Sequence, residues 1–281
     1  MSERTFAVIG HPIGHTMSPF IHQRLFSLSG SSGQYTVIDI PPEDLKNSMK
    51  TLSALTGYNI TIPHKQRIIP FLDKIDQKAA LYGTVNTVYN RNGSAEGFVT
   101  DPDGFLSALA YSGIPLKGKT VILGCGGVAR TFAFEAGLSG CDITIAAREE
   151  DFSARQLLMR ELKEKLHLTN VSVCRMDEIE GKIDLLINAT PVGMYPQTEH
   201  MPVSRKVIDN SKAVFDAIYN PLHTKLIEAA LANGAKAAGG MAMLVGQAVA
   251  AHKIWDGSEY QSDDILQLIE DSAKYQQKHF A

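Results

Sequence analysis

A short apolar strand that runs directly into a glycine-rich turn constrains the fold of this chain more than any other segment. Residues 119–123 predict the strand, and the turn that follows reads Gly124-Cys125-Gly126-Gly127-Val128-Ala129. It fits the pattern G-x-G-x-x-[GA], in which Gly124 permits a tight turn, Gly126 lets a pyrophosphate approach the backbone, and small Ala129 lets the next helix pack closely. The N–H groups at that helix start can bind phosphates. The segment therefore predicts a dinucleotide site that includes Gly127 and Val128; an ordinary turn is the alternative.

Strand-like and helix-like segments alternate along most of the chain. This order predicts an α/β fold with mainly parallel sheets. The 281 residues suggest two domains, one formed by 1–103 plus 241–281 and the other, of Rossmann type, by 104–240. Ser18 and Pro19 predict a helix start with serine as N-cap. The expected strands are 6–9, 35–40, 57–62, 85–89, 120–123, 143–146, 171–174, 185–188 and 214–216, and the expected helices include 42–55, 66–80 and the chain beyond 240.

Composition excludes several classes of function. The net charge of -3 gives no reason to expect a nucleic acid or an anionic membrane surface as partner. The three cysteines, Cys125, Cys141 and Cys174, lack C-x-x-C spacing, which favours reduced thiols in a cytoplasmic protein and no metal site. The longest apolar stretch, 241–251, is shorter than the roughly 20 residues of a membrane helix.

A lysine and an aspartate are the candidate catalytic residues. Lys65 follows a strand-like segment and a Pro-His turn, and Asp101 ends a second turn-rich segment, residues 97–101. A lysine held beside a carboxylate can transfer protons, because the carboxylate fixes its position. The alternative is that Lys65 is an ordinary solvated surface lysine.

The residues after the second strand of the Rossmann-type domain bear on the choice of cofactor. Glu149 lies 20 residues after Ala129, and a carboxylate there would bind a free ribose 2′-hydroxyl and repel a 2′-phosphate, which favours NAD. Arg148 instead favours NADP, since a guanidinium can pair with a phosphate; it can also stack on adenine. The alternative is a solvated charge cluster at a helix start.

Taken together, seven motifs in order resemble the shikimate dehydrogenase family over nearly the whole chain. The resemblance implies interconversion of 3-dehydroshikimate and shikimate with NADP or NAD, a substrate-binding first domain, and Lys65 and Asp101 as the catalytic pair. The segments are 10–19, 59–65, 83–87, 97–101, 124–130, 188–194 and 240–247.

The same resemblance implies the residues that bind substrate and cofactor. Thr16 and Ser18 would hold the substrate carboxylate, and Thr61, Asn86, Tyr219 and Gln247 the ring hydroxyls. Thr190, Met194, Ala217 and Gly240 would lie near the nicotinamide half of the cofactor. The residue types suit these roles, because hydroxyls before a helix start can face a carboxylate, and amides both donate and accept hydrogen bonds. Simple N-capping by Ser18 and buried structural amides are the alternatives.

Three departures from the family pattern leave the substrate and the cofactor open. Thr16 stands where the family usually has serine, Val99 where it usually has asparagine, and Ala147-Arg148-Glu149 followed by Phe152 where NADP-using members have Asn-Arg-Thr and a further arginine. The alternatives are an NAD-preferring quinate/shikimate dehydrogenase, a non-catalytic ligand-sensing relative, and a methylenetetrahydrofolate-type dehydrogenase. The protein is expected to be a monomer or homodimer.

Overall fold

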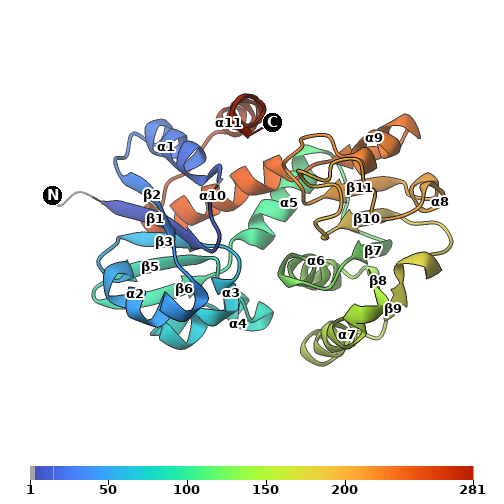
Figure 1. The fold of residues 1–281 in the computed structure, drawn as a ribbon, viewed down its shortest axis with the longest axis horizontal. Helices are drawn as coiled ribbons and strands as arrows, with labels where there is room; N and C mark the ends of the chain where they lie inside the picture. Colours follow the sequence, from blue (N-terminus) through green and yellow to red (C-terminus); the bar gives the residue numbers. More distant parts are fainter. Residues whose placement is uncertain (1–3, 15, 281) are drawn as a thin grey trace. The chain divides into compact units, whose positions relative to one another are not determined.

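The computed structural model describes residues 4–14 and 16–280, and the chain divides into two compact units. The first consists of Met1–Gly104 and Val245–Phe280, and the second of Phe105–Leu244. Each unit contains one six-stranded sheet with helices packed against it (Figure 1). Within the described ranges, no helix is both long and apolar enough to cross a membrane.

The sheet of the first unit is mixed, with strand order β2-β1-β3-β5-β6-β4. Strand β1 pairs in parallel with β2 and β3, and β4 with β6, whereas β5 is antiparallel to both β3 and β6. Asn92 and Gly93 make the β5–β6 turn with φ of 53° and 77°, the backbone that an Asn-Gly hairpin turn needs. The strands are β1 Thr5–Gly10, β2 Gln34–Asp39, β3 Gly57–Ile60, β4 Lys74–Ile75, β5 Thr87–Arg91 and β6 Ser94–Phe98.

The helices of this unit differ from the expected ones at two places. The single helix expected over 66–80 is wrong: α3, η2, β4 and α4 occupy this stretch. Pro70 explains the break, because proline lacks the N–H that an uninterrupted helix needs. Ser18 is the first residue of α1 and not its N-cap, which is Met17. The bounds are α1 Ser18–Leu28, η1 Pro42–Asp44, α2 Leu45–Leu52, α3 His64–Arg67, η2 Ile69–Phe71, α4 Gln77–Tyr82 and α11 Ser262–Phe280. Two further helices cross the division of the chain: α5 Asp101–Tyr111 begins in the first unit and ends in the second, and α10 Met241–Asp256 begins in the second and ends in the first.

Aromatic packing holds the C-terminal part of α10 on the first sheet. The Phe6 ring lies 5.2 Å from that of Phe26 and 4.7 Å from that of Trp255, measured between centroids, and all three side chains are buried. The indole Nε1 of Trp255 donates a hydrogen bond to the Val88 carbonyl (2.9 Å). A Cβ at Gly57 would lie 2.4 Å from that nitrogen, so only glycine lets the indole approach β3 this closely.

The sheet of the second unit is parallel throughout, with strand order β12-β11-β10-β7-β8-β9. The strand order reverses beside β7, and in such sheets ligands bind at the carboxyl ends of the strands at this point. The bounds are β7 Lys119–Leu123, α6 Gly127–Leu138, β8 Asp142–Ala147, η3 Glu149–Asp151, α7 Phe152–Leu166, β9 Val171–Arg175, η4 Met176–Glu178, β10 Leu185–Asn188, α8 Arg205–Asp209, β11 Ala213–Asp216, α9 Lys225–Ala232 and β12 Lys236–Ala238.

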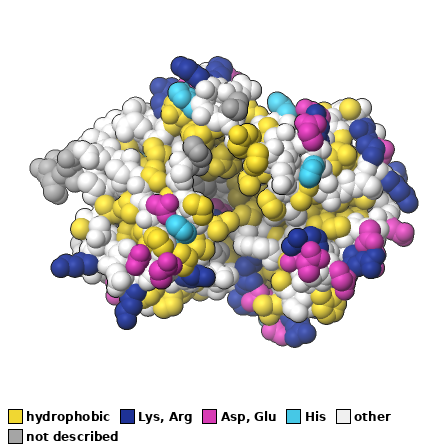
Figure 2. Space-filling view, viewed as in Figure 1, with side chains coloured by type: hydrophobic (Ala, Val, Ile, Leu, Met, Phe, Trp, Pro, Cys, Tyr) yellow, Lys and Arg dark blue, Asp and Glu magenta, His cyan; other side chains and the backbone are white. Residues whose placement is uncertain are grey.

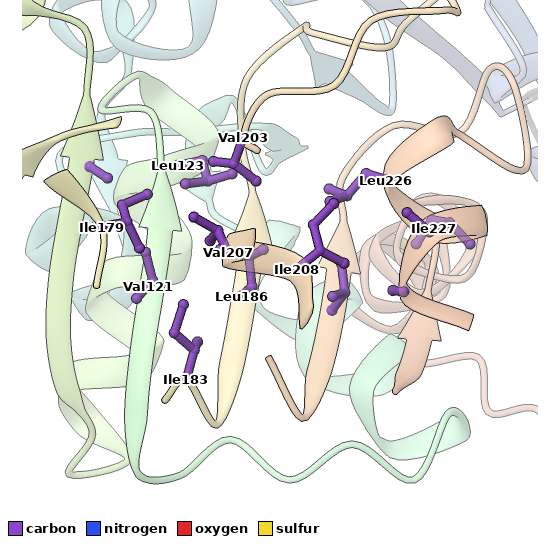
Figure 3. Packing of buried hydrophobic residues seen from close by; sticks show 14 residues of the cluster. Val121, Leu123, Ile179, Ile183, Leu186, Val203, Val207, Ile208, Leu226 and Ile227 are labelled. Carbon is purple, nitrogen blue, oxygen red and sulfur yellow. The ribbon is translucent and has the colours of Figure 1, made fainter. Parts of the chain in front are cut away.

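Both faces of the second sheet are buried. On one face, Val121, Leu186 and Val214 pack against apolar side chains of α8 and α9 (Figure 3). The next residue along β11, Phe215, points to the opposite face, where its ring lies 5.5 Å from that of Phe132 on α6. Near-continuous apolar strands are what a parallel sheet covered on both faces requires.

On the face seen in Figure 2, basic and acidic side chains are intermixed over the second unit, without a broad area of one sign. A polyanion such as nucleic acid would need a continuous basic area to bind electrostatically. That face therefore offers no such footprint.

Candidate active site

Six residues of the first unit gather at one edge of its sheet. Strands β1 and β3 are parallel, so the residues that follow them meet at the same edge. Because β5 runs the opposite way and β6 turns back again, the start of β5 and the end of β6 lie there too. Thr16 and Ser18 follow β1, Thr61 and Lys65 follow β3, Asn86 precedes β5, and Asp101 follows β6.

The lysine and the aspartate form a partly buried ion pair. The Nζ of Lys65 lies 2.5 Å from Oδ2 of Asp101, and the two side chains are 21% and 11% exposed. The backbone carbonyl of Lys65 accepts a hydrogen bond from the N–H of Val85 (2.8 Å). Asp101 is the first residue of α5, where the positive end of the helix dipole favours a carboxylate. The pair is therefore held in position before any substrate arrives.

Asn86 holds the other carboxylate oxygen. Its Nδ2 donates to Oδ1 of Asp101 (2.8 Å), while its Oδ1 accepts from the backbone N–H of Thr100 (2.7 Å). Asn86 and Thr100 are both buried. These bonds fix which way the amide faces, and one N–H of Nδ2 remains for a ligand.

Two further polar residues, Tyr35 and Asn59, extend this network into the core. Asn59 donates to the hydroxyl of Thr87 (3.0 Å) and accepts from the hydroxyl of Tyr35 (2.6 Å). Burial raises the pKa of Tyr35 well above its usual range, and a hydrogen bond with Ser18 opposes this. Neither residue was expected to have a role, although an asparagine within a buried strand is a signal in the sequence, because a buried amide needs hydrogen-bond partners.

The two hydroxyls expected to bind a carboxylate lie together. The hydroxyl of Thr16 donates to Oγ of Ser18 (3.1 Å) and accepts from the Ser18 N–H (3.2 Å). Thr61 packs against Gly10, where a Cβ would lie 2.5 Å from the threonine methyl group. His15, which belongs to the same sequence motif, lies outside the described residues.

Two further residues expected to bind the substrate belong to later parts of the chain. Gln247 is half-buried on α10 in the first unit. Tyr219 belongs to the second unit, where burial raises its pKa. The substrate contacts assigned to both stay predictions.

The second unit has a cavity of about 510 Å³ at the carboxyl ends of its strands. Gly124 begins the turn with φ of +99°, a conformation that favours glycine, and a Cβ there would lie 3.2 Å from the Ala189 carbonyl. A Cβ at Gly126 or Gly127 would meet no atom within 4 Å and would project into open space. The residues lining the cavity are Gly124, Cys125, Gly126, Ala147, Arg148, Asp151, Met176, Ala189, Thr190, Pro191, Val192, Met201 and Pro202.

This turn fits a dinucleotide. Gly126 is the N-cap of α6, a helix of twelve residues, and no side chain caps that end. Its first N–H groups can therefore receive a pyrophosphate in the space that side chains at 126 and 127 would fill. Ala129 is fully buried, as close packing of α6 on the sheet requires.

The charged residues after β8 form two separate groups: Arg148 pairs with both Glu150 and Asp151, and Glu149 pairs with Arg155. Arg148 donates from Nε to Oδ2 of Asp151 (2.9 Å), and this bond raises the pKa of Arg148. Glu149 instead lies 3.3 Å from Nη2 of Arg155, whose guanidinium is buried and also donates to the carbonyl of Cys174 (2.8 Å). Arg148 and Asp151 line the cavity, whereas Glu149 is not among its lining residues.

The remaining predicted cofactor residues follow three neighbouring strands, β10, β11 and β12. Thr190 lines the cavity, and Met194 is 45% exposed at the end of the same loop. A Cβ at Gly240 would lie 2.1 Å from the carbonyl oxygen of Ala217, so a side chain at 240 would collide with that backbone. No group of three or more His, Cys, Asp or Glu residues that could hold a metal ion occurs in the part of the chain that the structure describes.

Comparisons with known proteins agree on one family. The family model "Shikimate dehydrogenase substrate binding domain" matches residues 8–88. A shikimate dehydrogenase (NADP⁺) from Caldanaerobacter subterraneus is 36% identical over 271 residues, covering 95% of this chain and 96% of that one. A crystal structure of a shikimate dehydrogenase with NADP⁺ is 37% identical with a TM-score of 0.89, covering 96% of each chain. Shikimate 5-dehydrogenase from Thermus thermophilus, with NADP(H) and shikimate, is 31% identical with a TM-score of 0.84, covering 96% of this chain and 99% of that one.

Proposed function

Because the chain belongs to the shikimate dehydrogenase family, we propose that its NAD(P)-dependent interconversion of 3-dehydroshikimate and shikimate takes place at Lys65 and Asp101. The observation that supports this assignment is the 2.5 Å contact between Lys65 and Asp101, beside the residues expected to hold the substrate. An NAD-preferring quinate/shikimate dehydrogenase of broader specificity and a non-catalytic ligand-sensing relative are not favoured, since the relatives compared are shikimate dehydrogenases.

Proton transfer is the task of the lysine. A bound dinucleotide would supply the hydride in one direction and accept it in the other. Reduction of a ring ketone leaves negative charge on its oxygen, and the ammonium of Lys65 gives that oxygen a proton. In the reverse direction the neutral lysine accepts the proton from the hydroxyl. Asp101 holds the lysine in the same position for both the reduction and the reverse oxidation.

The substrate is held by the surrounding polar groups. Thr16 and Ser18 bind its carboxylate at the start of α1, where helix N–H groups add to the attraction. Its hydroxyls are bound by Thr61, Asn86, Tyr219 and Gln247. Asn86 contacts both substrate and Asp101, so it links the position of the ring to that of the catalytic pair.

NADP is the proposed preferred cofactor. The expectation of NAD rested on Glu149 facing the ribose, and the carboxylate of Glu149 bonds to Arg155 instead. Arg148 lies at the cavity with its side chain 65% exposed, so its guanidinium can turn from Asp151 to a 2′-phosphate. The two relatives compared above whose names specify NADP⁺ support the same choice.

Substitution of Arg148 tests this cofactor preference. Arg148→Ala should lower kcat/KM with NADP by about 10- to 100-fold, the value of one charge-assisted phosphate contact, and change kcat/KM with NAD much less. Arg175→Ala, which removes another exposed arginine of the same unit, is the control. Equal losses with both cofactors would contradict the assignment.

The protein is further proposed to act in the cytoplasm as a monomer or homodimer. Three free cysteines suit a reducing compartment. Light scattering on the purified protein distinguishes monomer from dimer.

Steady-state rates test the function itself. The wild-type protein should oxidise shikimate with NADP faster than quinate with either cofactor. A protein that turns over quinate but not shikimate would overturn the substrate assignment, and one inactive with both acids would overturn the catalytic one.

A further inference from the structure

A buried carboxylate stands next to the dinucleotide cavity of the second unit. Asp216 ends β11 and is completely buried. Its Oδ1 accepts hydrogen bonds from Nδ2 of Asn188 (3.0 Å) and the N–H of Ile218 (3.1 Å), and its Oδ2 accepts from the hydroxyl of Thr224 (2.7 Å). All three partners are neutral, so hydrogen bonds alone compensate the charge.

Asn188 connects this carboxylate to the cavity wall. It ends β10, beside β11, and its Oδ1 accepts from both the N–H (3.0 Å) and the hydroxyl (2.7 Å) of Thr190. The same hydroxyl accepts from the N–H of Val192 (3.2 Å). Thr190 and Val192 line the cavity. The orientation of one amide therefore determines where this loop lies.

The presence of a buried carboxylate at position 216, rather than an uncharged side chain, requires a physical explanation. An amide of the same shape would avoid burying a charge, which is costly without a cation. A charged acceptor, however, holds its donors about twice as strongly as a neutral one. A buried charged group lowers the stability of the fold. Where such a group lies beside a ligand cavity, it is typically one that serves function.

We propose that Asp216 is a positioning residue for the dinucleotide, whose carboxylate orients Asn188 and thereby holds residues 189–192 as a wall of the cavity. The inference rests on the proposed function, since that function places a dinucleotide in this cavity. It predicts that loss of the charge at 216 weakens dinucleotide binding without affecting the substrate acid.

The same arrangement predicts a pH dependence. Burial raises the pKa of Asp216 to about 6, while its hydrogen bonds to Thr224, Ile218 and Asn188 oppose the rise. The groups that face it from β10, from the chain after β11 and from the start of α9 are these neutral ones. Protonation puts a donor where the carboxylate accepts, so dinucleotide affinity should fall as the pH drops below about 6. A 2′-phosphate also titrates near pH 6, so the profile is measured with NAD as well as NADP.

The experiment compares Asp216→Asn with Asp209→Asn, which removes an exposed carboxylate of the same unit. Calorimetry gives Kd for NADP⁺ and NAD⁺, and steady-state rates give KM for shikimate. We expect Asp216→Asn to raise both dinucleotide Kd values about five- to tenfold, with KM for shikimate within about twofold of wild type. The wild-type Kd for NAD⁺ should rise below pH 6, and that of Asp216→Asn should not.

A double-mutant cycle shows whether Asp216 acts through Asn188. If it does, Asn188→Ala and the double variant Asn188→Ala/Asp216→Asn should have the same Kd. Additive losses, or an unchanged Kd in Asp216→Asn, would overturn the proposal. Should Asp216→Asn fail to fold, Thr224→Val replaces it, and it should weaken binding less than Asn188→Ala. A wild-type protein that binds neither dinucleotide would instead overturn the proposed function.

Discussion

At the scale of single residues, Lys65 is restrained both at its backbone and at its ammonium group. Its own carbonyl is bonded to Val85, and its ammonium to Asp101. A lysine that is already ordered loses little rotamer freedom when a substrate binds, so it can donate its proton without first being immobilised.

Loss of this ammonium should affect turnover more than binding. Lys65→Met keeps most of the apolar stem and removes the proton donor, so kcat should fall at least about 100-fold with a smaller change in KM. Lys74→Met, at an exposed lysine of the same sheet, is the matched control. A Lys65→Met enzyme with nearly full kcat would show that the proton comes from another group.

At the scale of elements, the segment from the end of β1 to the first residue of α1 carries the two hydroxyls that we propose bind the substrate carboxylate. Removing both hydroxyls in Thr16→Ala/Ser18→Ala should raise KM for shikimate more than tenfold, since each buried hydroxyl contributes about 1 kcal/mol or more to ligand binding. KM for the dinucleotide is the internal control and should stay the same. If both KM values rise together, the hydroxyls support the fold and not the acid.

Several elements of this fold could be predicted from sequence and others could not. The strand–turn–helix at 119–130 was readable because its glycines obey local steric rules. The helix expected at 66–80 was wrong because Pro70 interrupts it. Strand β12 was not expected because Lys236-Ala237-Ala238 has weak strand propensity. The network of Tyr35 and Asn59 joins residues that are distant in sequence, so local patterns could not predict it.

At the scale of the whole molecule, the buried Asp216 should limit stability at neutral pH. Its folded pKa of about 6 exceeds the ordinary 3.8, so the folded state binds this proton more tightly than the unfolded state. The contribution of Asp216 to the free energy of unfolding is therefore largest below about pH 4. It falls as the pH rises to about 6 and stays low above that pH. A difference of about 2 pKa units corresponds to about 3 kcal/mol.

Asp216→Asn should consequently melt at a higher temperature than wild type at pH 8, with a smaller advantage at pH 5. Thermal denaturation at both pH values measures this, with Asp209→Asn as the control. Equal destabilisation of Asp216→Asn at both pH values would mean that the carboxylate's hydrogen bonds outweigh its burial.

The β5–β6 hairpin makes the first unit open to engineering. Asn86 and Asp101, for which we propose roles in substrate binding and catalysis, lie at one edge of the sheet. The turn at Asn92 and Gly93 lies at the opposite edge and is exposed. Exposed turns of this kind accept added chain at little cost. A short Gly-Ser peptide or an epitope inserted between Asn92 and Gly93 should leave kcat within about twofold of wild type. The turn could then carry a label or an immobilisation tag remote from the chemistry.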